Sequence, residues 1–221
     1  MSDPGKPAAL EPREARADGR RASPSVARNR DAIHDALAEI LPGEAHVLEI
    51  ASGTGEHGIY MTERQPGLTW TFSDPDAEAR NSIAGWMAHT GESARRRGPL
   101  DLRTDQDGWT EAVADQLFDA VFCANMIHIA PWAAGRGLIL GAGQLLRPGG
   151  ALIVYGPFAR NGDIAPSNAR FSEDLARRDP AWGVRDLDRD LVPLAETAGL
   201  GLDRVMAMPA NNLTAVFRKR A

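Results

Sequence analysis

Short apolar runs alternate with longer segments of helical periodicity along most of this chain. The apolar runs have the length and composition of buried strands. They cover residues 47–50, 69–72, 100–102, 118–124 and 151–155. The expected helices cover residues 57–64, 76–89, 137–146 and 187–198. Because strands and helices alternate, we predict an α/β fold with a mostly parallel, doubly wound sheet.

The C-terminal end of the chain predicts a change of strand direction. Two apolar segments, residues 202–208 and 213–217, flank a short turn at residues 209–212. Two such runs joined by a turn of this length predict a β-hairpin. Together with the five earlier runs, they predict a seven-stranded sheet whose last strand is antiparallel.

The N-terminal part divides into two segments. Residues 1–22 are rich in Pro, Ala, Arg, Asp and Gly without an apolar period, so we expect a disordered tail whose removal changes little. Residues 23–42 predict a helix that ends at Pro42. Its apolar positions are Val26, Ile33, Leu37, Ile40 and Leu41. Since it directly precedes the first strand, we expect a lid over the ligand edge, within a single domain of residues 23–221.

Composition restricts the functional classes. The chain has 221 residues, enough for one α/β domain, and a formal net charge of −5, which gives no electrostatic case for nucleic-acid binding. No segment approaches the roughly 20 apolar residues of a membrane span, and no secretory signal is visible. The single cysteine, Cys123, excludes an intramolecular disulfide and a multi-cysteine metal site. We therefore expect a cytoplasmic protein that contacts neither membrane nor nucleic acid.

The segment after the first strand has the most specific pattern. Glu49, Ala51, Gly53 and Gly55 form the series E-x-A-x-G-x-G. Glycines here allow a tight turn and let a ligand approach the backbone. The third glycine of a dinucleotide fingerprint is missing, and an acid before the turn repels phosphate but suits a cationic ligand. The alternative is a glycine-rich turn that binds nothing.

Polar residues follow later strands at the same expected edge of the sheet. Asp74 lies 25 positions after Glu49. Its carboxylate can accept hydrogen bonds from both hydroxyls of a ribose, or it can cap the helix that starts near Asp76. Asn125 follows the fourth strand, where open α/β sheets bind ligands. His128 is a candidate general base or, alternatively, a packing residue.

Aromatic side chains accompany these polar positions and indicate a small-molecule pocket. The candidate lining residues are Trp132, Tyr155, Phe158, Asn168 and Trp182. The alternative is an ordered insertion that packs on itself. Arg28 lies near the start of the N-terminal helix, where an arginine can pair with a ligand carboxylate or remain solvated.

The glycine turn resembles motif I of the class I S-adenosylmethionine-dependent methyltransferases, with Ala51 where those enzymes usually have their first glycine. A longer series of motifs between residues 23 and 219 is more specific. It includes Leu-Glu-Ile-Ala-Ser-Gly-Thr-Gly-Glu-His, Asn-Met-Ile-His-Ile-Ala-Pro-Trp, Tyr-Gly-Pro-Phe and Met-Pro-Ala-Asn-Asn. In this series the chain resembles a largely uncharacterised methyltransferase-like family shared by bacteria and animals. The resemblance implies a Rossmann-like methyltransferase fold and the cofactor, but no particular acceptor.

Residue roles follow from this resemblance. The implied cofactor-binding residues are Arg28, Glu49, Ala51, Ser52, Gly53, Gly55, His57, Asp74, Asp101, Asn125 and Met126. Asp101 is the candidate for the adenine amino group, with Asp105 and Asp107 as competitors. The candidate lining residues would contact the substrate: Trp132, Tyr155, Phe158, Asn168 and Trp182.

These roles predict the chemistry. A sulfonium methyl group is already electrophilic, so we expect no metal. We expect direct in-line transfer to a small-molecule acceptor, with S-adenosylhomocysteine as product and His128 and Tyr155 as candidates for a base or for orientation. One alternative is a catalytically silent cofactor-binding module. The other is a nicotinamide-dependent oxidoreductase, which the missing glycine disfavours and which would not need the closing hairpin.

Overall fold

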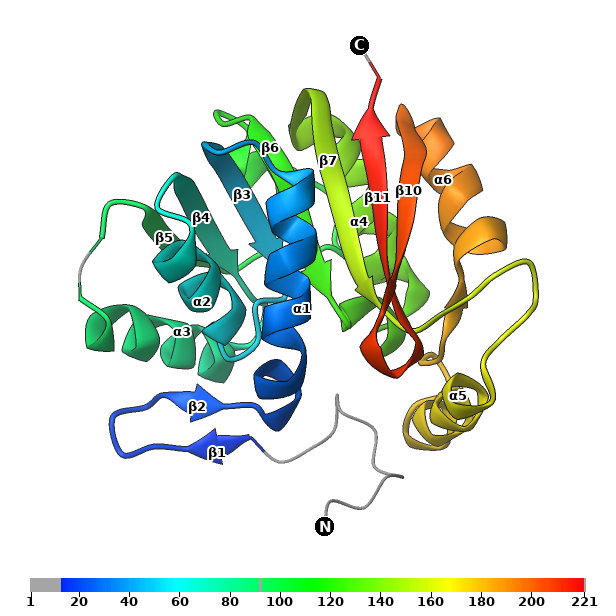
Figure 1. Cartoon of the computed structure of the whole chain (residues 1–221), viewed down its shortest axis with the longest axis horizontal. Helices are drawn as coiled ribbons and strands as arrows, with labels where there is room; N and C mark the ends of the chain where they lie inside the picture. Colours follow the sequence, from blue (N-terminus) through cyan, green and yellow to red (C-terminus); the bar gives the residue numbers. More distant parts are fainter. Residues whose placement is uncertain (1–12, 92, 221) are drawn as a thin grey trace.

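A seven-stranded sheet with helices on both faces forms the body of the molecule (Figure 1). The computed structural model describes residues 13–91 and 93–220. The helices are α1 (Pro24–Ile40), α2 (Glu56–Arg64), α3 (Ala77–His89), α4 (Trp132–Leu145), α5 (Pro166–Arg178) and α6 (Val192–Thr197). The strands of the large sheet are β3 (Ala45–Ile50), β4 (Leu68–Ser73), β5 (Arg96–Leu100), β6 (Phe118–Ala124), β7 (Leu146–Gly156), β10 (Leu200–Met208) and β11 (Asn212–Lys219). Four short strands form two small sheets: β1 (Glu14–Ala15), β2 (Arg21–Ala22), β8 (Phe158–Ala159) and β9 (Arg185–Asp186).

The strand order in the large sheet is β10-β11-β7-β6-β3-β4-β5. β3 pairs in parallel with β4 and β6, and the parallel pairing continues to β5 on one side and to β7 on the other. β11 is antiparallel to both β7 and β10. The prediction of a doubly wound, mostly parallel sheet with an antiparallel last strand is confirmed. Strands β4 and β5 follow on one side of β3, and β6 and β7 follow on the other, so the strand order reverses between β3 and β6. Sheets of this kind bind ligands at this position.

Two apolar cores, one on each face of the sheet, hold the layers together. Helices α1, α2 and α3 bury Leu37, Met61 and Ile83 against one face. Helices α4 and α6 bury Leu138 and Ala195 against the other. The central strands are apolar on both sides, as expected for parallel strands between helical layers. The predicted N-terminal helix is thus a full member of one core.

Some element boundaries differ from the sequence expectation. β5 lies several residues before the predicted strand 100–102, because polar contacts rather than an apolar run define it. α4 begins at Trp132 rather than at residue 137. Its glycines hide the helical period: a Cβ at Gly137 would lie 1.6 Å from the carbonyl oxygen of Thr104. Helix α5 has no counterpart among the predicted elements, and its buried residues are Asn168 and Leu175.

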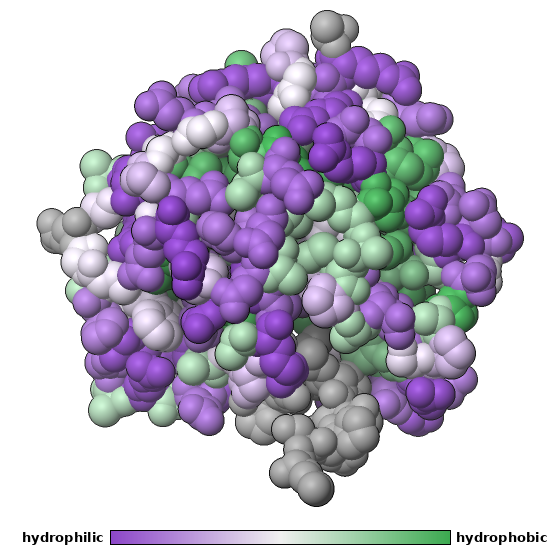
Figure 2. All heavy atoms as spheres, in the orientation of Figure 1, coloured by the Kyte–Doolittle hydropathy of each residue, from purple (hydrophilic) through white to green (hydrophobic). Residues whose placement is uncertain are grey.

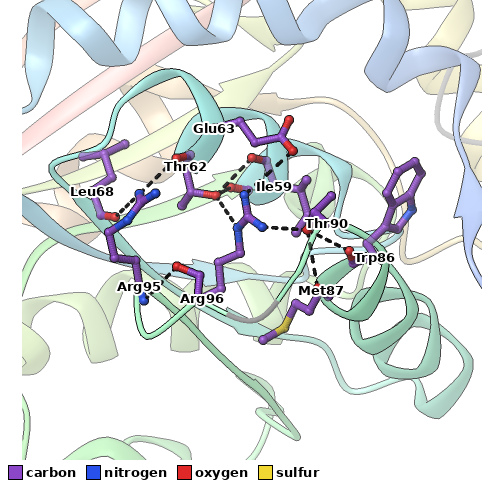
Figure 3. Close-up of polar contacts among 11 residues, drawn as sticks. Ile59, Thr62, Glu63, Leu68, Trp86, Met87, Thr90, Arg95 and Arg96 are labelled. Atoms are coloured by element: carbon purple, nitrogen blue, oxygen red, sulfur yellow. Dashed lines mark hydrogen bonds and ion pairs between the residues drawn. The ribbon is translucent and has the colours of Figure 1, made fainter.

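Arginines hold the edge strand β5 against its neighbours (Figure 3). Arg96 Nε donates to Thr62 Oγ1 of α2 (2.8 Å), and Arg96 Nη1 donates to Thr90 Oγ1 after α3 (2.6 Å). Arg95 Nη1 donates to the carbonyl oxygens of Thr62 (2.9 Å) and Leu68 (3.2 Å). These contacts fix the strand that leads directly to Asp101.

Residues 13–22 form a hairpin that is anchored on α3. β1 and β2 pair in antiparallel fashion. The N–H of Arg21 donates to Ser82 Oγ (2.9 Å), and its carbonyl oxygen accepts from Trp86 Nε1 (2.9 Å). The Arg20 guanidinium lies 4.7 Å from the centroid of the Trp86 ring. The expectation of disorder therefore does not hold for residues 13–22. Polar and cationic contacts hold this segment, so its sequence shows no apolar period. Residues 1–12 lie outside the described residues.

The face that carries α1 has a mixed surface. Figure 2 shows polar residues over much of this face and hydrophobic surface beside α1. This surface lies over the antiparallel strands, where Figure 1 shows no helix in front, and Met206 and Met208 of β10 pack there against the core. Within the described ranges, no helix combines the length and apolar character that crossing a membrane requires.

Candidate active site

The loop between β3 and α2 is a tight turn with three residues in the left-handed region. Ala51, Gly53 and Gly55 have φ angles of 56°, 60° and 88°. Gly55 serves packing, since a Cβ there would lie 2.9 Å from Ile83 Cγ1. Gly53 faces a different environment: the nearest group to a Cβ there would be the Arg13 guanidinium, at 3.5 Å. The absent side chain of Gly53 therefore leaves room above the turn, and among the described residues the Arg13 guanidinium is the group that reaches into it.

Ala51 is the one residue of these three that carries a Cβ. A left-handed conformation costs a residue with a Cβ about 1–2 kcal/mol. The next residue is fixed to β4, because Ser52 N–H donates to the carbonyl oxygen of Ser73 (2.8 Å) and Ser52 Oγ accepts from Ser73 N–H (3.2 Å). The backbone at Ala51 is thus held in the strained conformation by its surroundings.

Glu49 lies in the core directly before this turn. Its side chain is 1 % exposed, and Oε2 accepts a hydrogen bond from Trp70 Nε1 (2.9 Å). Burial raises the pKa of Glu49 to about 8, although the hydrogen bonds from Trp70 and Ser52 act in the opposite direction. The carboxyl group is therefore mostly protonated at neutral pH, and its electrostatic attraction for a cationic ligand is weak in this state.

Asp74 connects the glycine turn to the start of α3. Asp74 Oδ2 accepts from Gly53 N–H (2.8 Å), and Oδ1 accepts from Asp76 N–H (2.9 Å). The N-cap of α3 is Asp76, whose side chain accepts from Glu78 N–H (3.1 Å), so Asp74 is not the cap. The Asp74 side chain is buried at the carboxyl end of β4, and this burial raises its pKa. Each carboxylate oxygen keeps a further lone pair for a ligand hydroxyl.

Arg80 links Asp74 to Asp101. Arg80 Nη1 donates to the main-chain oxygen of Asp74 (2.8 Å), and Arg80 Nη2 lies 3.3 Å from Asp101 Oδ2. The Asp101 side chain is half exposed and also lies 3.6 Å from Arg103 Nε. Asp101 is therefore close to Asp74 through a shared partner, although it is exposed, as Asp105 and Asp107 are.

Helix α1 is joined to the site through Asn29. Asn29 Oδ1 accepts from His57 Nε2 (2.9 Å), and the Asn29 side chain also hydrogen-bonds with Tyr155 at the end of β7. Burial lowers the pKa of His57 to about 4, so its ring is neutral. Arg28, the predicted cofactor residue on this helix, is exposed at the same end. Sequence reasoning did not select Asn29, because its partners are distant in the chain and only its position between two arginines was visible.

The carboxyl end of β6 brings Asn125 and His128 next to β7. Asn125 has a φ of 62°, and its N–H donates to the carbonyl oxygen of Tyr155 (2.8 Å). Met126 follows in a short helical turn, Met126–His128, and is partly buried. His128 is 1 % exposed, and neither ring nitrogen has a hydrogen-bond partner among the described residues. Burial lowers the pKa of His128 to about 3, which leaves a neutral imidazole.

The segment after β7 lies beside His128. The Phe158 ring packs edge-on to the His128 ring with 4.9 Å between centroids. Gly156 permits this arrangement, since a Cβ there would lie 2.4 Å from His128 Nε2. Phe158 pairs with Arg185 in the β8–β9 ladder, and the Arg185 guanidinium lies 5.7 Å from the Trp132 ring centroid. The structure thus brings together the segments that contain His128 and Trp132, Gly156 and Phe158, and Arg185.

Two other predicted lining residues have mainly structural contacts. Asn168 is buried, and its Nδ2 donates to the carbonyl oxygen of Asn211 (2.9 Å), which ties α5 to the turn between β10 and β11. Trp182 is partly buried, and its N–H donates to the carbonyl oxygen of Asp179 (2.9 Å). Within residues 13–91 and 93–220, no group of three His, Cys, Asp or Glu side chains is arranged to hold a metal ion.

The sheet order, with its antiparallel last strand, defines the Rossmann-like fold of class I methyltransferases, and solved methyltransferase structures share it. The chain belongs to the family described as "Protein of unknown function (DUF938)", whose model matches residues 20–219. A relative from Mycolicibacterium vanbaalenii, named "Putative O-methyltransferase", is 29% identical over 164 residues, which are 73% of this chain and 68% of the relative.

Two solved structures illustrate the likeness of fold. The calicheamicin-biosynthesis methyltransferase CalO1, in its SAH-bound form, has a TM-score of 0.65 and 19% identity over 89% of this chain and 55% of its own. An O-methyltransferase family 2 protein from Planctomyces limnophilus, in complex with apigenin, has a TM-score of 0.65 and 17% identity over 86% of this chain and 60% of its own. This chain therefore spans little more than half the length of these solved proteins.

Proposed function

We propose that this protein is an S-adenosylmethionine-dependent methyltransferase that acts on a hydroxyl group of a small molecule. The observation that carries the proposal is the glycine turn at the switch point of a methyltransferase fold, with Asp74 bound to the backbone of Gly53 (2.8 Å). The similarity to an O-methyltransferase relative and to a structure solved with apigenin favours an oxygen acceptor and an aromatic substrate.

The described residues fit the cofactor in two respects. Among the described residues, the space above Gly53 is free of backbone and core side chains, because the Arg13 guanidinium alone lies within 4 Å of a Cβ there. Asp74 retains one acceptor position on each carboxylate oxygen, which suits the two ribose hydroxyls. In this proposal Asp101 receives the adenine amino group, and Asn125, Met126 and the exposed Arg28 receive the methionine portion.

Other candidate residues act by positioning in this proposal. Glu49, Ala51, Ser52, Gly55 and His57 shape the turn and fix α1 and β4 around it. When bound, the cofactor would supply an electrophilic methyl group on a sulfonium, and the acceptor would enter as the phenolate, its hydroxyl proton having passed to the solvent. This chain must align the acceptor and exclude water, and α1, which Asn29 holds across the site, suits that task.

Geometry favours orientation over proton transfer for the two catalytic candidates. The His128 ring is neutral, as a base requires, but it is enclosed between Gly156 and Phe158. The Tyr155 side chain is bound by Asn29, and burial raises its pKa. We assign both residues to shaping the acceptor side, together with Trp132, Phe158, Asn168 and Trp182.

The proposal is tested by two measurements on one preparation. Isothermal titration calorimetry measures binding of S-adenosylhomocysteine, and tritium transfer from methyl-labelled S-adenosylmethionine is followed over a panel of hydroxylated aromatic compounds that includes apigenin. We expect binding and transfer in the wild type and loss of both in Gly53→Val, since the new side chain would fill the space above the turn.

The matched control is Gly149→Val. Gly149 also has a positive φ, 77°, with nothing within 4 Å of an added Cβ, and it lies near the opposite end of β7. Gly149→Val strains the backbone as Gly53→Val does, but its side chain fills no ligand space, so binding should stay intact. Binding without transfer to any compound would favour a catalytically silent cofactor-binding module. Absent binding together with an absorbance change of NAD(P)H would favour an oxidoreductase.

A further inference from the structure

Arg13 lies in the space where the proposed cofactor site opens. A Cβ on Gly53 would be 3.5 Å from Arg13 Nη2 and 4.0 Å from Arg13 Cζ, and within residues 13–91 and 93–220 no other group is that near. The Arg13 side chain is exposed, and its charge also acts on Asp74, where it lowers the pKa against the raising effect of burial. The guanidinium thus lies above the turn, and its charge acts on the carboxylate to which we assign the ribose.

The hairpin of residues 13–22 holds Arg13 there. Arg16 N–H donates to the carbonyl oxygen of Arg20 (2.8 Å), which closes the hairpin. The hairpin is bound to α3 through Ser82, whose Oγ accepts from Arg21 N–H (2.9 Å) and donates to the main-chain oxygen of Thr54 in the glycine turn (2.9 Å). Ser82 therefore connects the hairpin directly to the turn that Arg13 overlies.

We propose that the hairpin of residues 13–22 is an autoinhibitory gate in which Arg13 competes with the cofactor for the space above Gly53 and for Asp74. The inference rests on the proposed function. A ligand that approaches the backbone of Gly53 requires the volume that the guanidinium fills. The two ribose hydroxyls require the acceptor positions of Asp74. While Arg13 is present, its positive charge compensates the negative charge of this carboxylate. Binding therefore requires Arg13 to leave and the ribose to take its place.

The gate belongs to a part of the chain outside the shared family core. The family match begins at residue 20, so Arg13 and β1 precede it, whereas the residues that the hairpin contacts, Ser82 and Trp86, lie within it. The charge of Arg13 acts on Asp74 from an exposed position, and interactions between exposed charges contribute up to about 1 kcal/mol. Loss of the competing charge should thus tighten binding by up to about fivefold.

The test is calorimetric titration of the full chain with S-adenosylhomocysteine. Arg13→Gln should bind about two- to fivefold more tightly than the wild type. Arg178→Gln makes the same charge change at the exposed end of α5 and should bind as the wild type does. Because salt screens an exposed pair, raising sodium chloride from 50 to 500 mM should tighten binding in the wild type more than in Arg13→Gln.

The outcomes separate this inference from the proposed function. Equal or weaker binding by Arg13→Gln, with the wild type binding normally, overturns the gate alone. No binding by either protein overturns the proposed function and the gate together. Because Arg13 is exposed, its substitution should lower the melting temperature by no more than about 2–4 °C, and circular dichroism would verify that both proteins are folded.

Discussion

Replacing Asp74 by Asn distinguishes its structural role from a role in binding. The carboxylate accepts one N–H from Gly53 and one from Asp76 (2.8 and 2.9 Å). Asparagine has a single acceptor oxygen, so one of these N–H groups loses its partner and faces an NH2 group. Hydrogen bonds to a charged group contribute about 1.5–3 kcal/mol. We expect the free energy of unfolding to fall by about that amount, and the melting temperature by about 2–4 °C per kcal/mol.

Affinity should fall as well if Asp74 holds the ribose. Losing charge-assisted hydrogen bonds worth about 1.5–3 kcal/mol weakens S-adenosylhomocysteine binding by about 10- to 150-fold. Calorimetry and thermal unfolding on one preparation measure both effects. Asp76→Ala is the matched control, because it removes the N-cap of α3, at a cost of about 1 kcal/mol, without touching Gly53. A less stable Asp74→Asn that binds with wild-type affinity would refute the ribose role.

Three further substitutions test the environment of the site. Burial gives Glu49 a folded-state pKa of about 8, above its ordinary value of 4.5, so its contribution to stability is present at low pH and is lost as pH rises towards 8. Denaturant unfolding should show Glu49→Gln gaining stability over the wild type between pH 5 and pH 9, and a constant difference would contradict this. For His128 the dependence on pH is opposite, because its pKa is lowered from 6.5 to about 3. Its contribution to the free energy of unfolding is therefore lost as pH falls below 6.5. Between pH 7 and pH 5, His128→Leu should lose less stability than the wild type. Ala51→Gly removes a left-handed strain of about 1–2 kcal/mol and adds a glycine entropy cost of about 0.4–1 kcal/mol, so thermal unfolding should show little change or a gain, and a clear loss would mean that Ala51 is not strained.

The sequence predicted those features that rest on local pattern. Apolar runs separated by helical segments determined the sheet, and the terminal hairpin predicted the antiparallel strand. The turn at Gly53 and Gly55 was also visible, because glycine is the residue that a left-handed turn next to a ligand requires. The two glycines nevertheless serve different purposes, close packing on Ile83 and an open ligand side, and only the structure separates them.

The pattern of residues along the sequence does not predict contacts between polar residues that are far apart in the chain. Asn29 joins His57 and Tyr155 across three elements, and nothing in its local sequence distinguishes it from a solvated helix residue. Helix capping was the alternative role that the sequence offered for Asp74. In the structure, the N-cap of α3 is Asp76, two positions later. The N-terminal hairpin escaped prediction because cation–π and backbone contacts with Trp86, not apolar burial, hold it.

A crystal structure with S-adenosylhomocysteine would test the assignment of the site most directly. We predict electron density for the nucleoside above Gly53, with the two ribose hydroxyls within hydrogen-bonding distance of the Asp74 carboxylate and the Arg13 guanidinium displaced from the turn. Density for the ligand elsewhere, or ribose hydroxyls that do not reach Asp74, would contradict the assignment of this turn as the cofactor site.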